Sequence, residues 1–320
     1  MLTTPLIAHL ARSGTVDVVT TPGAAPLLAG NRDIRRVISY DKRGDARGLA
    51  GLARVASLVR AETAGATAYL AQGSWRSAAL AFFAGYGHRV GFSTSAGRWL
   101  YSSRNRYRHD QHHAERLLRL AIGDNAAIPP ERLTPALFPS ESDKEAVTRL
   151  LAANGATGVP LVALAPGSVW ATKRWPGYPA LASALASHGR IVVIGGPGDR
   201  DLAAAIRSAV ADAIDTTGQL PLLASAELIG RSALLVTNDS LPQHLASAMG
   251  TRTVTIYGPT IPGFGFGPLA DHSATVGQEF LDCRPCHPHG PPECPLGHHR
   301  CMRDLATAEV LSRALSALAA

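Results

Sequence analysis

The chain has 320 residues, of which 46% are hydrophobic and 17% are charged. At roughly 100–200 residues per domain, this length predicts two domains, and the apolar content excludes an intrinsically disordered chain. No uncharged apolar run approaches the roughly 18–20 residues that span a bilayer, and the first residues lack the basic and apolar regions of a secretory signal. We therefore expect no transmembrane helix and a cytoplasmic location.

The positive charge of the chain is concentrated in its first half. The net charge is +7, and residues 1–150 hold 20 Lys and Arg against 12 Asp and Glu, a balance of 20 − 12 = +8. The excess is densest at Arg89, Arg98, Arg104, Arg106, Arg108, Arg116 and Arg119. Such a concentration of positive charge favours a polyanionic partner: a phosphorylated glycolipid, an anionic membrane surface or nucleic acid. The alternative is a basic surface that is only solvated. Because no nucleic-acid-binding motif is present, nucleic acid is not the expected partner.

Short strands alternate with helices in the first half of the chain. Runs rich in β-branched and aromatic residues predict strands at Thr15–Thr20, Arg35–Tyr40, Ala66–Ala71 and His88–Phe92, and helical spacing predicts helices at Leu49–Val59 and Ser77–Phe83. Residues 126–140 contain four prolines and read as a linker, because proline cannot continue a helix. The predicted domains are therefore residues 1–140 and 141–320.

The second half repeats this alternation more clearly. A helix is expected at Asp143–Ala153, followed by strands at Leu161–Ala165, Ile191–Gly195, Leu234–Thr237 and Thr253–Tyr257, and by helices at Pro179–His188, Arg200–Ala213, Leu222–Ile229 and Leu241–Met249. Strands with near-continuous apolar runs, separated by helices, are typical of a parallel sheet covered on both faces. The predicted fold class is α/β, with two Rossmann-like domains whose parallel sheets face each other across a cleft.

The segment APGSVWATKRWP, residues 165–176, follows a predicted buried strand. Ser168 can offer a hydroxyl and backbone N–H groups at the carboxyl end of that strand, and Lys173 and Arg174 place cations five and six residues later. A diphosphate needs such N–H donors and a neutralising ammonium group. The alternative is a surface loop whose cations are only solvated.

The segment LLVTNDSLPQHLASAMG, residues 234–250, joins a predicted strand to a predicted helix. Asp239 or Ser240 is the expected N-cap, and Ser240 with Gln243 fits a capping box. The free N–H groups of this helix end suit a phosphate or a sugar hydroxyl, and His244 lies one turn after Ser240. The alternative is that Asp239 and Ser240 only cap the helix and that His244 is a half-buried structural histidine.

The glycine-rich loop GGPGDRD, residues 195–201, follows the second strand of this half. Its glycines permit close backbone approach, and Asp199 or Asp201 could accept a hydrogen bond from a ribose hydroxyl. The spacing is not that of the dinucleotide fingerprint, and an ordinary helix N-cap explains Asp199 equally well.

All four cysteines of the chain fall in one segment, at Cys283, Cys286, Cys294 and Cys301. Their spacing, together with four nearby histidines, allows a structural zinc site, although it departs from the usual paired knuckles. The prolines of the same segment stiffen it without any metal, and this is the preferred interpretation. A catalytic thiol is not expected, because no partner base is identifiable.

These segments, taken in order, resemble the heptosyltransferases of glycosyltransferase family 9, and the branch that they resemble is heptosyltransferase II of lipopolysaccharide synthesis. The motifs that carry the resemblance are LTTPL at the start, APGSVWATKRWP, IGGPGD, TNDSLPQH, LASAMGT, YGPT at residues 257–260, and CPLGHHRCM. Together they cover essentially the whole chain.

The resemblance implies a GT-B architecture in which residues 1–140 bind the acceptor and residues 141–320 bind the nucleotide sugar. It implies an inverting transfer, without metal or other cofactor, from ADP-L-glycero-D-manno-heptose to the inner core on lipid A, at the cytoplasmic face of the inner membrane. By motif match, Lys173 neutralises the leaving diphosphate and Ser168 donates to it. Asp239, Ser240 and His244 contact the heptose and phosphates, and Asp199 contacts the nucleotide.

Two departures from the family pattern qualify these implications. Family members have a strand and a Gly-Asp pair shortly before the Thr-Thr-Pro, and that Asp resembles the general base; here Met1 directly precedes Leu2-Thr3-Thr4-Pro5, so the base is unassigned and expected upstream of Met1. Leu241 stands where the family usually has Gly, and a side chain there could crowd the donor or alter which sugar fits. The competing interpretations are therefore a non-catalytic nucleotide-sugar-binding relic and a sugar-nucleotide epimerase of the same fold.

Overall fold

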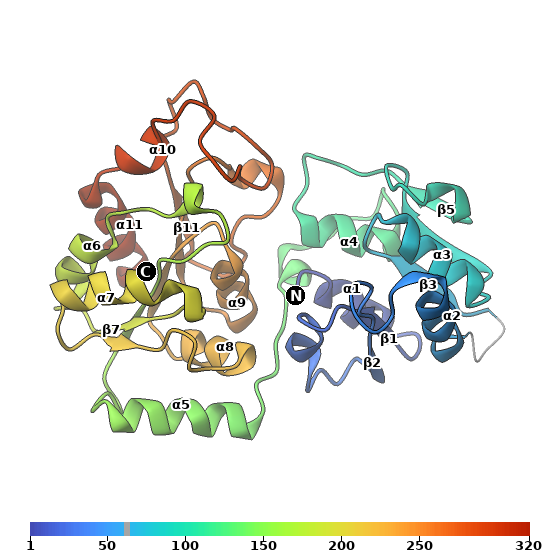
Figure 1. Cartoon of the computed structure of the whole chain (residues 1–320), viewed down its shortest axis with the longest axis horizontal. Coiled ribbons are helices and arrows are strands. Elements are labelled where there is room, and N and C mark those ends of the chain that lie inside the picture. Colours follow the sequence, from blue (N-terminus) through green and yellow to red (C-terminus); the bar gives the residue numbers. More distant parts are fainter. Residues whose placement is uncertain (61–64) are drawn as a thin grey trace. The chain divides into compact units, whose positions relative to one another are not determined.

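The computed structural model describes residues 1–60 and 65–320, which form two compact units (Figure 1). The first unit is residues 2–133, and the second is residues 134–320 with Met1. The division falls within the proline-containing segment that the sequence predicts to be a linker. None of the helices in the described residues has both the length and the apolar composition needed to cross a lipid bilayer.

The first unit contains short parallel strands separated by helices. Its elements are α1 (Thr4–Leu10), β1 (Asp17–Thr20), η1 (Ala25–Leu28), β2 (Arg36–Ser39), α2 (Gly48–Leu58), β3 (Thr67–Leu70), α3 (Trp75–Phe83), β4 (His88–Phe92), η2 (Arg98–Leu100), β5 (Ser103–Asn105), α4 (His113–Ile122) and η3 (Pro130–Leu133). All the strand and helix predictions for residues 1–140 are confirmed to within a few residues. Helices α1 and α4 are additional, and they pack on each other and on β4 through Leu6, Phe92 and Leu117.

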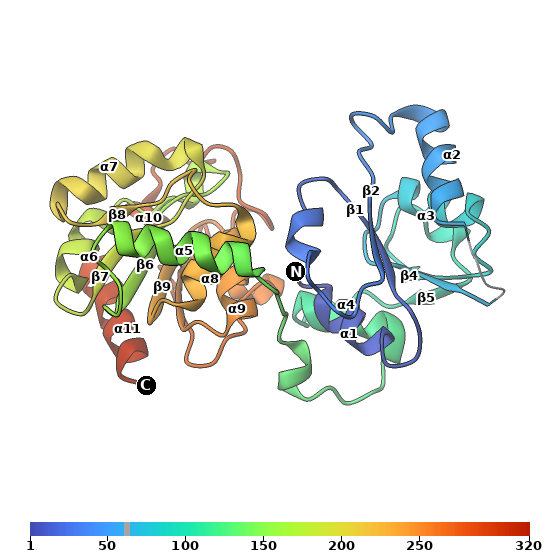
Figure 2. The ribbon, with the colours of Figure 1, turned by 90° about the horizontal axis from the view of Figure 1, so that it is seen from below.

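The strands of the first unit lie in two sheets rather than in one. Strands β1 and β2 pair only with each other, while β3, β4 and β5 form a three-stranded sheet, as Figure 2 shows. Val19 on β1 and Val37 on β2 are exposed, although valine is a residue of sheet interiors. The first unit thus has the alternating helices and parallel strands of a Rossmann-like domain, but β1 and β3 are not paired with each other.

The second unit is a doubly wound α/β domain. Its elements are α5 (Glu141–Ala153), β6 (Leu161–Ala165), η4 (Ala171–Lys173), α6 (Tyr178–Leu185), β7 (Arg190–Val193), η5 (Pro197–Asp199), α7 (Arg200–Ala209), β8 (Ile214–Asp215), α8 (Leu222–Gly230), β9 (Leu234–Asn238), α9 (Leu241–Met249), β10 (Thr253–Ile256), η6 (Pro262–Phe264), β11 (Ala274–Val276), α10 (Arg300–Arg303) and α11 (Thr307–Ala319). The six strands are all parallel, in the order β11-β10-β9-β6-β7-β8.

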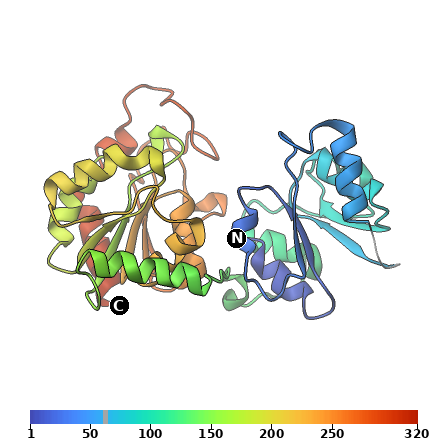
Figure 3. The same ribbon diagram turned by 60° about the horizontal axis from the view of Figure 1, so that its bottom comes forward.

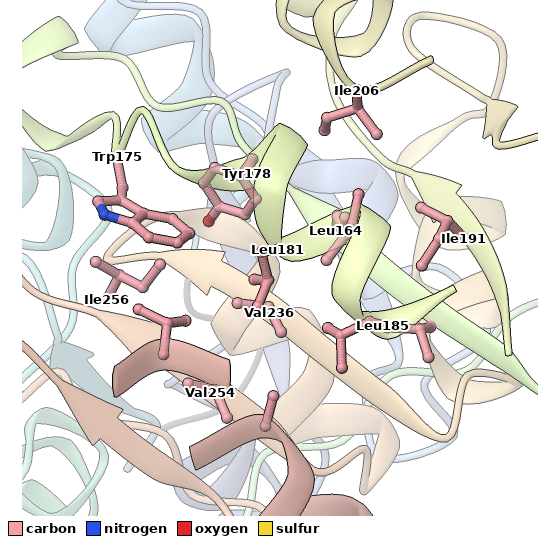
Figure 4. Packing of buried hydrophobic residues seen from close by; sticks show 14 of the residues in the cluster. Leu164, Trp175, Tyr178, Leu181, Leu185, Ile191, Ile206, Val236, Val254 and Ile256 are labelled. Carbon is pink, nitrogen blue, oxygen red and sulfur yellow. The ribbon is translucent and has the colours of Figure 1, made fainter. Parts of the chain in front are cut away.

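Helices cover both faces of this sheet (Figure 3). Helices α6, α7 and α11 pack together on one side, and α5, α8 and α9 pack together on the other. On the first side, Tyr178, Leu181 and Leu185 of α6 lie against Leu164, Val236 and other strand residues, as seen in Figure 4. Burying a side chain of this size stabilises a fold by about 1.5–3 kcal/mol, so this continuous core makes the sheet a rigid platform for its edge loops. The predicted α/β class with parallel sheets is confirmed.

Candidate functional site

Two loops meet at the carboxyl edge of the second unit's sheet because β6 and β9 are neighbouring parallel strands. The side-chain amide of Asn238, at the end of β9, donates to the Pro166 carbonyl at 2.8 Å, and its oxygen accepts the Trp175 backbone N–H at 3.3 Å. Ser240 Oγ lies 3.4 Å from the Gly167 carbonyl. The predicted phosphate-binding segment and the predicted helix start are therefore one connected structure.

Lys173 and Asp239 form an ion pair at the centre of this edge. Lys173 Nζ donates to Asp239 Oδ2 at 2.7 Å and to the Asp239 carbonyl at 3.2 Å. The two side chains are only 10% and 13% exposed. The sequence predicts neither that the lysine is buried nor that a carboxylate neutralises it. The alternative of a solvated surface lysine is wrong.

The Asp239 carboxylate is held by two further donors. Thr260 Oγ1 donates to Oδ2 at 2.7 Å, and Gln243 Nε2 lies 3.3 Å from Oδ1 and 2.7 Å from the Phe266 carbonyl. The Tyr257 hydroxyl donates to Gln243 Oε1 at 3.2 Å. Burial, followed by the Asp239 charge, raises the pKa of Tyr257 well above its usual range, so the phenol stays protonated as a donor. This network fixes the position of the carboxylate and, through it, of the ammonium.

Helix α9 begins at this network, but not with the predicted capping box. Ser240 is the N-cap, as predicted, yet its side chain makes no capping hydrogen bond. Gln243 turns instead toward Asp239 and Phe266, because a carboxylate and a carbonyl lie on that side of the helix. Gly250 ends the helix with a φ of 71°, a left-handed conformation that glycine adopts without strain.

The remaining predicted residues lie around the same edge. Ser168 is partly buried, and its carbonyl accepts from the Arg174 guanidinium at 3.0 and 2.8 Å. Asp199 lies against Gly167, where an added Cβ would be 2.4 Å from its carboxyl carbon, and it accepts the Gly196 N–H at 2.9 Å. It is the N-cap residue of α7, as the N-cap interpretation predicted, but its side chain makes no capping hydrogen bond to that helix. His244 is partly buried on α9.

Leu241 occupies the first turn of α9 with its side chain exposed. It is therefore accessible beside Asp239 rather than part of the core. A side chain at this position lies where a ligand at the helix end would approach.

The cysteine-containing segment forms a wall of this site. Thr172 donates to the Pro291 carbonyl at 2.6 Å, and the Cys286 N–H donates to the Pro259 carbonyl at 2.9 Å. Gly290 has a φ of 82°, and a Cβ there would lie 2.6 Å from Lys173 Cε. The segment thus touches the elements on both sides of the ion pair.

The four cysteines of this wall are free thiols in the structure. Burial, followed by the neighbouring Cys286, raises the pKa of Cys301 to about 11, which disfavours its thiolate. Within residues 1–60 and 65–320, no three His, Cys, Asp or Glu side chains are arranged to hold a metal ion. Cys283, Cys286 and Cys294 all act on the pKa of Cys301, and the alternative zinc site at these four cysteines stays a prediction.

A surface hollow of about 340 Å³ lies elsewhere on the second unit, lined by Pro160, His188 and Arg190 among others. These residues are at the amino ends of β6 and β7, the edge of the sheet opposite to the Lys173–Asp239 pair. Ligands of open α/β sheets bind at the carboxyl edge, so this hollow is not the candidate site.

Three site residues were not predicted from the sequence as members of the site: Thr260, Tyr257 and Gln243. The YGPT motif contains the first two, but its letters do not reveal that Thr260 donates to the carboxylate of Asp239, which follows a different strand. Spacing alone assigned Gln243 to a local cap. Contacts across neighbouring strands are the signal that the single sequence lacks.

The arrangement can bind an anion. The amino end of the nine-residue helix α9 carries partial positive charge and free N–H groups. The Lys173 ammonium lies close to this end, because it donates to the carbonyl of Asp239, the residue before the N-cap. The Pro166–Ser168 loop adds backbone donors at the same edge.

The comparisons with known proteins agree with this geometry. The sequence profile of glycosyltransferase family 9 (heptosyltransferase) matches residues 55–294. Lipopolysaccharide heptosyltransferase 2 of Escherichia coli is 31% identical over 228 residues, which are 65% of this chain and 64% of that protein. The chain thus aligns with less than two thirds of that relative's length.

Two solved structures share the fold over nearly the whole chain. A family 9 glycosyltransferase from Veillonella parvula has a TM-score of 0.81 at 21% identity, with 99% of this chain and 93% of that chain covered. The E. coli ADP-heptose lipopolysaccharide heptosyltransferase II has a TM-score of 0.78 at 22% identity, with 99% and 94% covered. On the profile match, with the fold in agreement, the chain belongs to glycosyltransferase family 9, the heptosyltransferase family.

Proposed function

We propose that this chain is an inverting glycosyltransferase that moves heptose from ADP-L-glycero-D-manno-heptose to the inner core of lipopolysaccharide. The proposal rests on family membership and on one observation: the Lys173 ammonium is fixed 2.7 Å from Asp239 Oδ2, beside the amino end of α9. Residues 141–320 would bind the donor, and residues 1–140 would bind the acceptor. The enzyme would act at the cytoplasmic face of the inner membrane and would need no metal or other cofactor.

The charge and geometry around Lys173 support its role at the diphosphate. An ammonium has three N–H donors, and two of them are used by the carboxylate and carbonyl of Asp239. The third is available for a phosphate oxygen that approaches the end of α9. A buried cation that is already positioned loses little entropy on binding and stabilises the negative charge that develops on the departing ADP.

The other residues divide between the nucleotide and the sugar. Ser168 and the α9 backbone would donate to the phosphates, and Asp199 beside Gly167 would lie near the nucleotide. Asp239, Ser240 and His244 would contact the heptose hydroxyls and phosphates, with Asp239 held in place by Thr260. The exposed Leu241 side chain would limit which sugar fits there.

The general base is not assigned to a residue of this chain. The motif resemblance implies a carboxylate base shortly before the Thr-Thr-Pro segment, and the proposed roles of the residues named above do not depend on it.

One observation favours a second candidate, a non-catalytic protein that binds nucleotide sugar. The Asp239 carboxylate neutralises Lys173 before any ligand is present, which reduces the net positive charge offered to a diphosphate. An assay with ADP-heptose and a purified inner-core acceptor separates the two. Transfer with inverted anomeric configuration, determined by NMR of the product, supports the proposed enzyme. Donor binding measured by calorimetry without any transfer supports the second candidate.

A further inference from the structure

Three large aromatic side chains are exposed together on the first unit. Trp99 of η2 is 73% exposed, Trp75 at the start of α3 is 55% exposed, and Phe82 near its end is 48% exposed. Trp75 and Phe82 are seven residues apart, so they project from the same side of the helix. Apolar side chains of this size are rarely left in water together unless they contact a partner.

The loop that carries Trp99 packs against α3, the helix that carries the other two aromatic residues. A Cβ on Gly97 would lie 2.4 Å from the Ala78 methyl group and 3.0 Å from Trp75 Cα, so the segment leading into η2 lies over the first turn of α3. At the other end of α3, Arg89 stacks on Phe82 at 5.4 Å and donates to the Leu100 carbonyl at 2.6 Å. Trp75 therefore lies near one end of the loop that carries Trp99, and Phe82, through Arg89, lies near the other.

Arginines accompany two of the three exposed rings, Phe82 and Trp99. Arg98 and Arg104 both stack on Trp99, with 4.9 and 5.5 Å between the guanidinium carbon and the ring centroid. Residues 65–109 contain six arginines, at 76, 89, 98, 104, 106 and 108, and no Asp or Glu. The surface thus combines exposed rings with positive charge, and no acidic residue of this stretch compensates that charge.

We propose that Trp75, Phe82, Trp99, Arg89, Arg98 and Arg104, which we call the aromatic–arginine patch, dock the chain on an anionic lipid bilayer. Tryptophan is favoured at the level of lipid headgroups because its ring is apolar and its N–H is polar. Guanidinium groups pair with lipid phosphates. This inference builds on the proposed function, because an acceptor carried by lipid A lies in such a bilayer.

The same chemistry also occurs at single-stranded nucleic acid sites, where bases stack on aromatic rings. One observation favours the bilayer. Arg98 and Arg104 already lie over the Trp99 ring, so a base would have to displace them in order to stack there. Nucleic acid is therefore an outcome of the test and not part of the proposal.

Vesicle binding tests the patch. We expect the full chain to bind vesicles of phosphatidylethanolamine with phosphatidylglycerol, to bind phosphatidylcholine vesicles much more weakly, and to dissociate as salt is added. The double variant Arg98→Glu with Arg104→Glu, and separately Trp99→Ala, should weaken binding to the anionic vesicles by about tenfold or more. Brominated phosphatidylglycerol should quench the tryptophan fluorescence, and Trp99→Phe should reduce that quenching.

Matched controls lie on the second unit. Arg207→Glu with Arg303→Glu makes the same charge change at exposed positions, and Phe280→Ala removes a ring that is almost fully exposed. These variants should bind the vesicles as the unaltered chain does. Circular dichroism checks that each variant keeps its fold. If Trp99→Ala does not fold, Trp99→Phe replaces it, because this change keeps an aromatic ring.

The inference is overturned if the patch and control variants lose vesicle binding equally, if binding is the same to neutral vesicles, or if the chain binds single-stranded RNA through the patch but not the vesicles. The vesicles contain neither donor nor acceptor. Vesicle binding without heptose transfer would therefore refute the proposed function alone, and transfer to a soluble acceptor without vesicle binding would refute the patch alone.

Discussion

We expect the two members of the buried Lys173–Asp239 ion pair to differ in their effect on ADP binding. Lys173→Met removes the cation, and it should weaken ADP binding by about 1–3 kcal/mol, or roughly 5- to 150-fold, the worth of a charge-assisted hydrogen bond to phosphate. Asp239→Asn removes the competing carboxylate and leaves the ammonium available. It should bind ADP as tightly as the unaltered chain or several-fold more tightly.

The same two substitutions should destabilise the fold to different extents. Breaking a buried pair by removing one partner costs about 3–5 kcal/mol. After Lys173→Met, Asp239 still accepts from Thr260 at 2.7 Å and lies 3.3 Å from Gln243 Nε2, so the cost should fall near the lower end. After Asp239→Asn, the ammonium retains the carbonyl of residue 239 at 3.2 Å, so the cost should fall near the upper end.

Calorimetric titration with ADP and thermal unfolding together test this reasoning. At about 2–4 °C per kcal/mol for a unit of this size, the expected loss of Tm is about 6–12 °C for Lys173→Met and more for Asp239→Asn. The double variant Lys173→Met with Asp239→Leu should be more stable than Asp239→Asn, because an apolar pair leaves no buried charge. Equal losses of ADP affinity in both single variants would refute the assignment of the cation to the phosphate.

Three further substitutions test neighbouring parts of the structure. Thr260→Val removes the hydroxyl that donates to Asp239 and should lower the free energy of unfolding, measured with urea, by about 1–3 kcal/mol. Thr255→Val is the control, because this buried hydroxyl has no hydrogen-bond partner in the described structure, and the substitution should be neutral or stabilising. Equal losses in the two variants would contradict the network. Gly290→Ala should lower the affinity for ADP measured by calorimetry, because the added Cβ would meet Lys173 Cε and the φ of 82° is strained for alanine. Unchanged affinity would show that the cysteine-containing segment does not position Lys173. Burial, followed by Arg116, lowers the pKa of His113 to about 4, so the stability from its neutral form is complete above about pH 6.5 and is lost as the pH falls toward 4. The unaltered chain should therefore lose about 2 kcal/mol of stability between pH 7 and pH 5 through His113, and His113→Asn should not show this loss. Thermal unfolding at pH 5 and pH 7 measures the difference, and the same pH dependence in both proteins would contradict the role of His113.

The strands and helices of the second unit could be predicted because each has a local signal. Strand β6 is the apolar run Leu161–Ala165, and α9 has a proline in its first turn and ends at Gly250. Helix α11 was not predicted, although Val310 and Ala314 are fully buried against the sheet. Its buried residues Val310, Ala314 and Ala317 recur at helical spacing, so the sequence did contain a signal for this helix. Its position depends on contacts with β10 and β11 that are distant in the chain.

The site was predictable in its location but not in its electrostatics. Neighbouring parallel strands bring the two loops together, and the sequence correctly places Lys173 and Ser240 at one edge. It does not reveal the ion pair, because Lys173 and Asp239 are separated by 66 residues and each has its own local interpretation. The capping-box prediction failed for the same reason, since Gln243 finds distant acceptors that a local pattern cannot include.

Hydrogen–deuterium exchange of the full chain with and without ADP-heptose tests most directly where the donor binds. The account predicts slower exchange in peptides covering residues 166–174 and 239–245, and unchanged exchange at 186–191, which lie at the opposite edge of the sheet. Protection confined to the first unit or to 186–191, or no protection at saturating donor, would contradict the claim that this edge of the second unit binds the sugar nucleotide.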